Sequence, residues 1–106
     1  MIKRSDLKTF EEALAEDLQD PEFRREWERT ALARAVSERL IQYCVEHGLT
    51  QTALARKLGM QQSAIARLEA GEHNPSIDTL SRLSRDLGIN INIVVGPETV
   101  TFDLTA

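Results

Sequence analysis

Glycine residues divide the middle of this chain into short segments, and each segment carries apolar residues at helical spacing. Glycine is favoured directly after the last turn of a helix, where the backbone often turns left-handed. The glycines that close these segments are Gly48, Gly59, Gly71 and Gly88. The pattern over residues 31–88 therefore predicts four helices joined by tight turns.

The predicted helix starts agree with these ends. Thr50 is a candidate N-cap for a helix over residues 51–58, since its side-chain oxygen can accept a free amide of the first turn. Pro75-Ser76 opens a helix over residues 77–87. The last helix carries one apolar face, made of Ile77, Leu80, Leu83 and Leu87.

Two helices are predicted toward the N-terminus, and the second of them extends into this region. Residues 5–19 are amphipathic, and Asp20-Pro21 then ends that helix and starts another, which could run unbroken over residues 21–47. The first helix carries Leu7, Phe10, Leu14 and Leu18 on one face. The second has an apolar face near its end made of Val36, Leu40, Ile41, Cys44 and Val45. Cys44 is therefore expected to be a core residue.

The periodicity changes from helical to alternating after Gly88. Apolar residues alternate along the chain on both sides of a turn at Gly96-Pro97-Glu98. They are Ile89, Ile91, Ile93 and Val95 before the turn, and Val100, Phe102 and Leu104 after it. This predicts a β-hairpin over residues 89–106. Its apolar face either caps the helices or pairs with a second copy, and the β-branched residues favour dimerisation.

The net charge of −4, taken over the whole chain, argues against nucleic-acid binding. The charge is unevenly distributed, because residues 1–30 and 89–106 hold the excess of acidic side chains. Residues 31–88 carry 7 basic and 6 acidic side chains. A nearly neutral middle can still bind DNA if its basic residues gather on one face.

The composition also argues against several kinds of protein and site. A single cysteine leaves no internal disulfide or cysteine-rich zinc site, and the two histidines lack metal-ligand spacing. No glycine-rich phosphate loop or nucleophile motif is present, so we expect no enzyme, no catalytic residues, no cofactor and no metal. Without a membrane-length apolar run or a secretory signal, the expected location is cytoplasmic.

Residues 49–71 predict two short helices that cross at a sharp turn, which Gly59 permits. The apolar residues that would face each other are Leu54, Leu58, Ile65 and Leu68. The second helix, over residues 61–70, keeps an outer face made of Gln61, Gln62, Ser63, Ala66 and Arg67. Such a helix fits the major groove of B-DNA, where glutamine can pair with adenine and arginine with guanine.

Residues 32–88 resemble the Cro/lambda-repressor-like (XRE) helix-turn-helix domain over nearly its whole length. The resemblance is carried by Leu-Thr-Gln at 49–51, Leu-Gly at 58–59, Ile-Ala-Arg-Leu-Glu-Ala-Gly at 65–71 and Asn-Pro-Ser at 74–76. It implies a mainly α fold with three parts: a helical arm over 1–30, a DNA-binding helix-turn-helix domain over 31–88, and the hairpin over 89–106. The function that it implies is sequence-specific binding of double-stranded operator DNA by a homodimer that represses transcription.

The same resemblance assigns roles to individual residues. Bases are read by Gln62, Ser63 and Arg67, with Gln61 at the edge of this set. The DNA backbone is contacted by Thr50, Gln51 and Asn74. Glu69 supports the fold by capping or pairing. The domain carries fewer basic residues on this face than many family members do.

The flanks resemble HigA-type antitoxins, because an acidic helical arm containing Asp-Pro-Glu-Phe at 20–23 precedes the domain and a short hairpin follows it. This implies a toxin–antitoxin operon in which the chain neutralises a small, basic, RNase-like toxin and represses its own operon. Phe23 and Trp27 either pack on the first helix or anchor that partner. Two alternatives stay open: a stand-alone regulator without a toxin, and a protein-interaction module that uses the helix-turn-helix as a scaffold.

Overall fold

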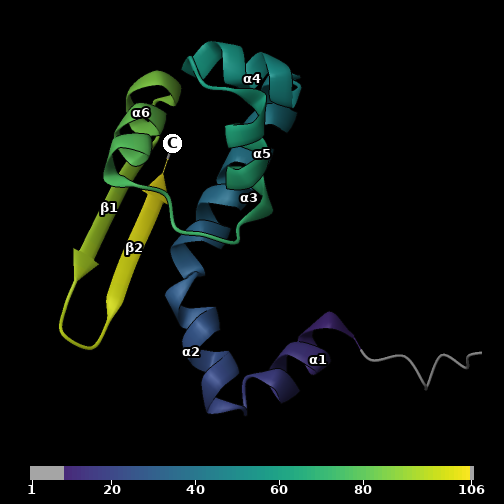
Figure 1. Ribbon diagram of the computed structural model, residues 1–106, viewed down its shortest axis with the longest axis vertical. Coiled ribbons are helices and arrows are strands. Elements are labelled where there is room, and N and C mark those ends of the chain that lie inside the picture. The colour runs from purple at the N-terminus through teal and green to yellow at the C-terminus, as the bar shows by residue number, and fades with distance from the viewer. Residues whose placement is uncertain (1–8, 106) are drawn as a thin grey trace, which may run out of the picture. The chain divides into compact units, whose positions relative to one another are not determined.

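The computed structural model describes residues 9–105 and is mainly helical, with one small antiparallel hairpin (Figure 1). The predicted fold class is confirmed. The chain divides into two compact units, of which the first ends at Ala31 and the second begins at Leu32. The elements are α1 (Phe10–Asp17), α2 (Pro21–Arg29), α3 (Ala31–His47), α4 (Gln51–Leu58), α5 (Gln62–Ala70), α6 (Ile77–Leu87), β1 (Asn90–Val95) and β2 (Val100–Thr105).

Helix α1 is shorter than the predicted helix over residues 5–19. Thr9 is its N-cap in an extended conformation, and Thr9 and Glu12 form a capping box. This box satisfies free amides at the helix start, so the helix begins at Phe10. Residues 5–8, and with them Leu7, lie outside the described residues. Phe10 is 72% exposed and does not belong to a buried stripe.

The prediction of one unbroken helix over residues 21–47 is wrong, because α2 ends at Arg29. Thr30 leaves helical geometry, with φ −100° and ψ 13°. Its hydroxyl donates to the carbonyl oxygen of Glu26 at 2.9 Å, and its amide bonds the same oxygen at 3.1 Å. A threonine hydroxyl that competes for backbone acceptors in this way weakens helix continuation. At the other end of α2, Asp20 caps the helix and Pro21 occupies its first position, as predicted.

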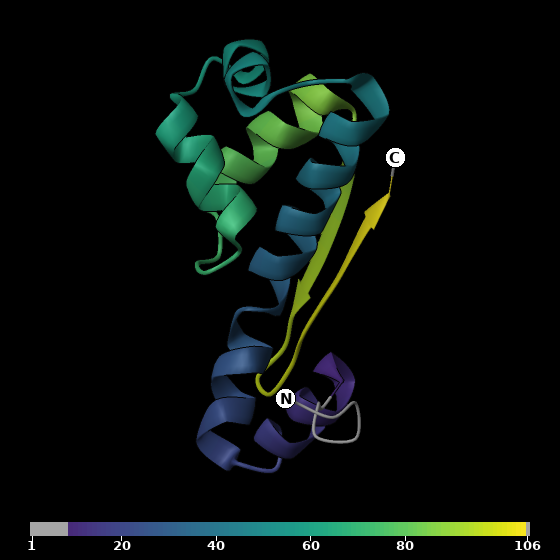
Figure 2. The same cartoon turned by 90° about the vertical axis from the view of Figure 1, so that its right-hand side faces the viewer.

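The second unit contains the four helices α3 to α6 predicted between residues 31 and 88. Its core is formed mainly by aliphatic side chains from all four helices. The largest fully buried ones are Val36, Leu40, Leu54, Ile65 and Leu83. Figure 2 shows α3 as the long helix against which the shorter ones gather. These contacts explain why short helices are stable here, since helices of this length gain most of their stability from packing.

The apolar face predicted for the end of α3 is partly wrong. Ile41 and Val45 are 45% and 77% exposed, and Cys44 is half-buried at the edge of the core. The buried face of α3 follows a different helical stripe, made of Ala33, Val36, Ser37, Leu40 and Tyr43. Ile77 is also an exception, at 73% exposure, because it begins α6 at the margin of the core.

The hairpin places one face against the helices. Ile91 pairs with Leu104 and Ile93 with Phe102 across the two strands. Ile91, Ile93 and Leu104 pack against the helical core, and the strands run beside α3 and α6 (Figure 2). The inner face therefore caps the helices, one of the two roles predicted for it.

Near its turn the hairpin is much more exposed. Val95 and Val100 are 75% and 55% exposed, so the apolar alternation does not predict burial in this part. Across the turn, the amide of Gly96 donates to the carbonyl oxygen of Thr99 at 2.8 Å. As for membranes, none of the helices in the described part of the chain is long and apolar enough to cross one.

Candidate nucleic-acid interface

Helices α4 and α5 are joined by a tight turn. Gly59 has the left-handed φ of 65° expected after a helix end, and the amide of Met60 bonds the carbonyl oxygen of Ala55 at 2.9 Å. Ala55 is itself 4% exposed, so a small residue lies where the helices approach. Leu54 and Ile65 are fully buried between the helices and the core. The opposite side of α5 is consequently free.

The predicted base-reading residues all lie on that free side. Gln61, Gln62, Ser63 and Arg67 are exposed, whereas Ile65 between them is buried. Gln61 is the N-cap rather than the first helical residue, and its side chain makes no capping hydrogen bond. The start of α5 therefore has no side-chain cap of its own. Uncapped amides of this kind can bind a phosphate.

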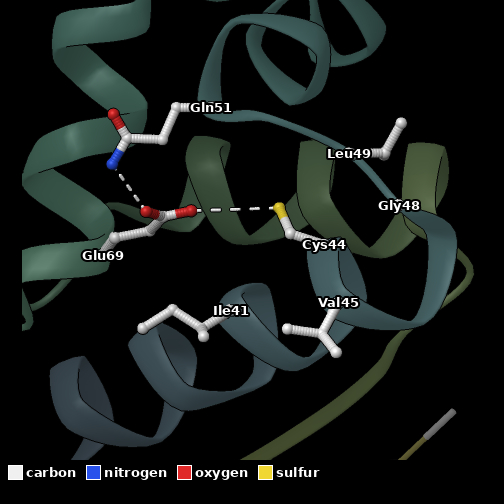
Figure 3. Close-up of a pocket in the computed structure, with 7 residues that line it drawn as sticks. All are labelled: Ile41, Cys44, Val45, Gly48, Leu49, Gln51 and Glu69. Carbon is white, nitrogen blue, oxygen red and sulfur yellow. Dashed lines mark hydrogen bonds between the residues drawn. The ribbon is translucent and has the colours of Figure 1, made fainter.

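Gln51 connects the starts of the two helices through hydrogen bonds. Its Oε1 accepts from Nε2 of Gln62 at 3.3 Å. Its Nε2 donates to Oε2 of Glu69 at 2.7 Å (Figure 3). The Glu69 carboxylate thus fixes the Gln51 amide, and Gln51 in turn orients Gln62. Sequence reasoning expected Glu69 to support the fold but did not identify Gln51 as its partner.

Thr50 stands next to this chain of hydrogen bonds as the N-cap of α4. Its Oγ1 accepts from the amide of Ala53 at 3.1 Å. A hydroxyl that accepts in this way still has a proton to donate. Thr50 can therefore cap its helix and bond an outside oxygen at the same time.

Asn74 has a structural contact that the sequence did not indicate. Its Oδ1 accepts from the amide of Ala33, near the start of α3, at 3.1 Å. The sequence separation of 41 residues explains why no local pattern predicted the contact. The predicted contact of Asn74 with the DNA backbone stays a prediction.

A second contact missed from the sequence attaches the end of α5 to α3. The Ser37 hydroxyl donates to the backbone carbonyl oxygen of Glu69. At the following turn, Gly71 has φ +67°, and a Cβ placed there would lie 3.2 Å from Cβ of Ser37. A serine within an otherwise apolar helix face was the available signal, because a buried hydroxyl needs a partner.

Cys44 faces the same carboxylate from α3. Its Sγ lies 3.9 Å from Oε1 of Glu69, a weak contact at most. Burial, and then the negative charge of Glu69, raise the pKa of the Cys44 thiol. The thiol is therefore held in its protonated, poorly nucleophilic form.

Phe23 and Trp27, the predicted partner-binding residues, belong to the first unit. They lie one turn apart on α2 and are both half-buried. Their rings stack with centroids 6.2 Å apart and planes 17° apart. This pairing gives α2 a short aromatic ridge among charged residues.

The comparisons with known proteins agree with this geometry. The family model described as "Helix-turn-helix" matches residues 40–94, which include α4, α5, α6 and most of β1. The chain belongs to this helix-turn-helix family, of the XRE type. The match also covers the turn at Gly59 and the Gln51–Gln62–Glu69 contacts.

The chain is also similar to proteins from a bacteriophage and an archaeon. The chain is 37% identical to an immunity repressor protein of Bacillus phage phi105 over 65 residues, which are 61% of this chain and 45% of that protein. It is 32% identical to an uncharacterized HTH-type transcriptional regulator of Methanocaldococcus jannaschii over 56 residues, covering 53% of this chain and 85% of that one. The chain thus spans less than half of the phage repressor. No solved structure matches the chain.

Proposed function

We propose that this helix-turn-helix protein is a sequence-specific DNA-binding transcriptional repressor that reads its operator with α5. The observation that carries the proposal is the exposed polar face at the start of α5, held in register by the Gln62–Gln51–Glu69 hydrogen bonds. Groups held in place before binding lose less freedom when they bind. The names of relatives as a repressor and as transcriptional regulators support the same function.

Each residue has a proposed role in the major groove. Gln62 and Arg67 would bond base edges, and Ser63 either a base or a phosphate, with Gln61 at the margin. Thr50 and Gln51 would donate to phosphate oxygens beside the groove, and Asn74 would contact the backbone. In chain order, the side chains proposed to contact DNA are those of Thr50, Gln51, Gln61, Gln62, Ser63, Arg67 and Asn74.

The small number of basic side chains on α4 and α5 determines how strongly DNA binding should depend on salt. Only Arg56 and Lys57 of α4 and Arg67 of α5 are basic within the two crossing helices, and all three are exposed. Few phosphates can therefore be neutralised by one copy. We expect operator affinity to depend only weakly on salt. Each phosphate that the protein neutralises steepens the plot of log affinity against log salt concentration by about 0.9, and few phosphates are neutralised here.

The decisive measurement has two steps. The protein first selects its preferred DNA duplexes from a random pool, and its affinity for the selected duplex is then measured at several salt concentrations. Arg67→Ala is expected to weaken binding by about 1–3 kcal/mol and to relax the preference at one base pair. Arg82→Ala, which removes an exposed charge from α6, is the matched control. Equal losses in both variants, or no binding by the unaltered protein at low salt, would remove α5 as the reading helix.

A homodimer is part of the proposal, because two copies of α5 would read half-sites about one DNA turn apart or a multiple of it. The exposed outer part of the hairpin, at Val95 and Val100, is the candidate contact. Sedimentation velocity of the whole chain tests this, with Val100→Lys as the disrupting variant. A dimer unaffected by Val100→Lys would place the interface on the helices instead.

We further propose that the chain is the antitoxin of a toxin–antitoxin operon and that its N-terminal unit binds a small basic, RNase-like toxin. Two features support this. Helix α1 carries four acidic side chains and no basic one, whereas α2 carries three of each, and the Phe23–Trp27 ridge of α2 offers an apolar anchor. Opposite charge speeds the encounter of two proteins, and buried aromatic residues often dominate their affinity.

Copurification from the native host tests the antitoxin proposal. The expected result is a stoichiometric small basic protein encoded beside this chain, which is lost with Trp27→Ala and retained with Arg24→Ala. A complex that is indifferent to Trp27→Ala would move the interface away from the ridge. Recovery of operator DNA without any partner would instead support a stand-alone regulator.

A further inference from the structure

A pocket lies on the side of the helix-turn-helix unit where the end of α3 meets the start of α4 and the end of α5 (Figure 3). Its volume is about 380 Å³. It is lined by Ile41, Cys44, Val45, Gly48, Leu49, Gln51 and Glu69. None of the groups predicted to contact bases lies in this lining.

The outer wall of the pocket is apolar and uncovered. Ile41 and Val45 lie one turn apart on α3 and are 45% and 77% exposed, and Leu49 is half-buried beside them. Ile41 and Val45 continue the apolar pattern of α3 but belong neither to the buried core nor to the partly buried side chains packed against it. Neighbouring exposed apolar side chains of this kind mark interaction surfaces more often than single ones do.

The inner end of the pocket carries a negative charge. Glu69 is half-buried, and its Oε2 accepts from Gln51. Its other oxygen, Oε1, is turned toward Cys44, whose thiol is a weak donor 3.9 Å away. Among residues 9–105 no basic side chain forms an ion pair with this carboxylate. A carboxylate forms its strongest hydrogen bonds with cationic donors, and no basic side chain of the described residues supplies one to Glu69.

We propose that this pocket binds the side chain of an arginine supplied by a basic protein partner. The aliphatic stem would lie on Ile41 and Val45, and the guanidinium would donate to Oε1 of Glu69. Arginine fits better than lysine, because its planar head is less strongly hydrated than an ammonium group and is therefore easier to bring into a partly apolar pocket. Only the partner's identity rests on the proposed antitoxin function, since the chemistry of the pocket does not depend on it.

The pocket is one hydrogen bond away from the proposed DNA-reading face. Because Gln51 uses Oε2 of Glu69, an arginine at Oε1 can bind without displacing it. The occupant would hold in place the carboxylate that orients Gln51 and, through it, Gln62. This pocket is thus a second protein contact, on the helix-turn-helix unit itself rather than on the acidic arm.

The test uses the whole chain and a defined probe, Nα-acetylarginine N-methylamide, followed by backbone amide shifts in ¹⁵N spectra. We expect saturable shifts confined to residues 41–51 and the end of α5. The matched probe is Nα-acetylcitrulline N-methylamide, which has nearly the same shape without the charge, and it should produce none of these shifts. Equal responses to both probes, or shifts spread over helices α1 and α2, would overturn the proposal.

Two variants separate the charge from the apolar wall. Glu69→Gln should weaken probe binding about tenfold, the factor that corresponds to loss of one charge-assisted hydrogen bond. Glu72→Gln, at an exposed acid that does not line the pocket, is the control and should leave binding unchanged. Val45→Ser, at a position too exposed to disturb the core, should weaken binding several-fold.

These results show whether the pocket binds an arginine side chain, whatever the outcome of the DNA-binding experiments. Unchanged probe affinity in both Glu69→Gln and Val45→Ser would refute the arginine site even if operator binding is confirmed. If the chain binds no operator at all, the proposed repressor function fails, while the shifts still show whether the pocket takes an arginine.

Discussion

The two units of this chain differ in the interactions that stabilise each of them internally. Every buried apolar side chain of the described residues lies in the second unit, between Ala33 and Ile89. No residue of α1 or α2 is buried. Their described contacts include side-chain caps at both helix starts and the Phe23–Trp27 stack within α2.

This difference teaches that regular secondary structure and a folded core need not coincide within one chain. Isolated helices as short as α1 and α2 are marginal in water. An example of an exposed local interaction is the ion pair in α2, where Arg29 bonds Glu26 at 2.7 Å and both side chains face solvent. The hydrogen bond from Arg29 lowers the pKa of the Glu26 carboxyl group. We expect the second unit to unfold cooperatively and the first to contribute little until a partner covers its apolar residues.

The largest effect should come from matched leucine truncations in the two units. Leu54→Ala removes a fully buried side chain and is expected to lower the free energy of unfolding by about 2–5 kcal/mol. Leu14→Ala, at a half-buried position of α1, should cost less than about 1 kcal/mol. Urea unfolding followed by circular dichroism measures both. Similar losses would break the comparison, because they would place α1 within the same cooperative core.

A pair of glycine substitutions tests how tightly α3 packs against the end of α5, the helix proposed to read DNA. Gly59 and Gly71 both have left-handed φ, so alanine at either position should cost about 1–2 kcal/mol of strain. A new Cβ meets nothing within 4 Å at Gly59, but it meets Ser37 at 3.2 Å at Gly71. Thermal unfolding should therefore show the greater loss for Gly71→Ala. The reverse order would mean that the α3–α5 contact is loose.

The architecture of the second unit was predictable because its signals are local. Thr50 and Ser76 cap the helices that were predicted to start there, and the left-handed φ at Gly59 marks a predicted end. The exposed side of α5 followed from the same reasoning, since Ile65 had to face inward. Short helices with a cap at one end and glycine at the other leave little freedom in their boundaries.

What the sequence did not predict depends on contacts between distant residues or on competition within one turn. The Gln51–Glu69 and Ala33–Asn74 bonds join positions 18 and 41 residues apart. The break at Thr30 arises from a hydroxyl that competes for a helix carbonyl, which apolar periodicity does not register. The exposure of Val45 depends on which stripe of α3 the other helices cover.

Equivalent threonine caps offer a finer comparison of the two units. Thr50→Ala removes the oxygen that accepts the Ala53 amide in the packed unit, and it is expected to cost about 0.5–2 kcal/mol. Thr9→Ala removes the corresponding acceptor for Glu12 in α1. The second change should reduce helical circular dichroism slightly without moving the unfolding midpoint. A shift of that midpoint with Thr9→Ala would show that α1 and the core unfold together.

The smallest effect is expected for deletion of residues 1–20, which removes α1 and leaves the core side chains in place. The free energy of unfolding should change by no more than about 0.5 kcal/mol, since the deletion removes none of the buried side chains of the second unit. Backbone amide spectra should keep the resonances of α3 to α6 and the hairpin. Residues 32–105 contain the buried core and every residue proposed to contact DNA, so operator affinity should also persist. A large loss of stability would mean that the N-terminal unit supports the core through contacts that burial does not reveal, and the two units would then have to be treated as one.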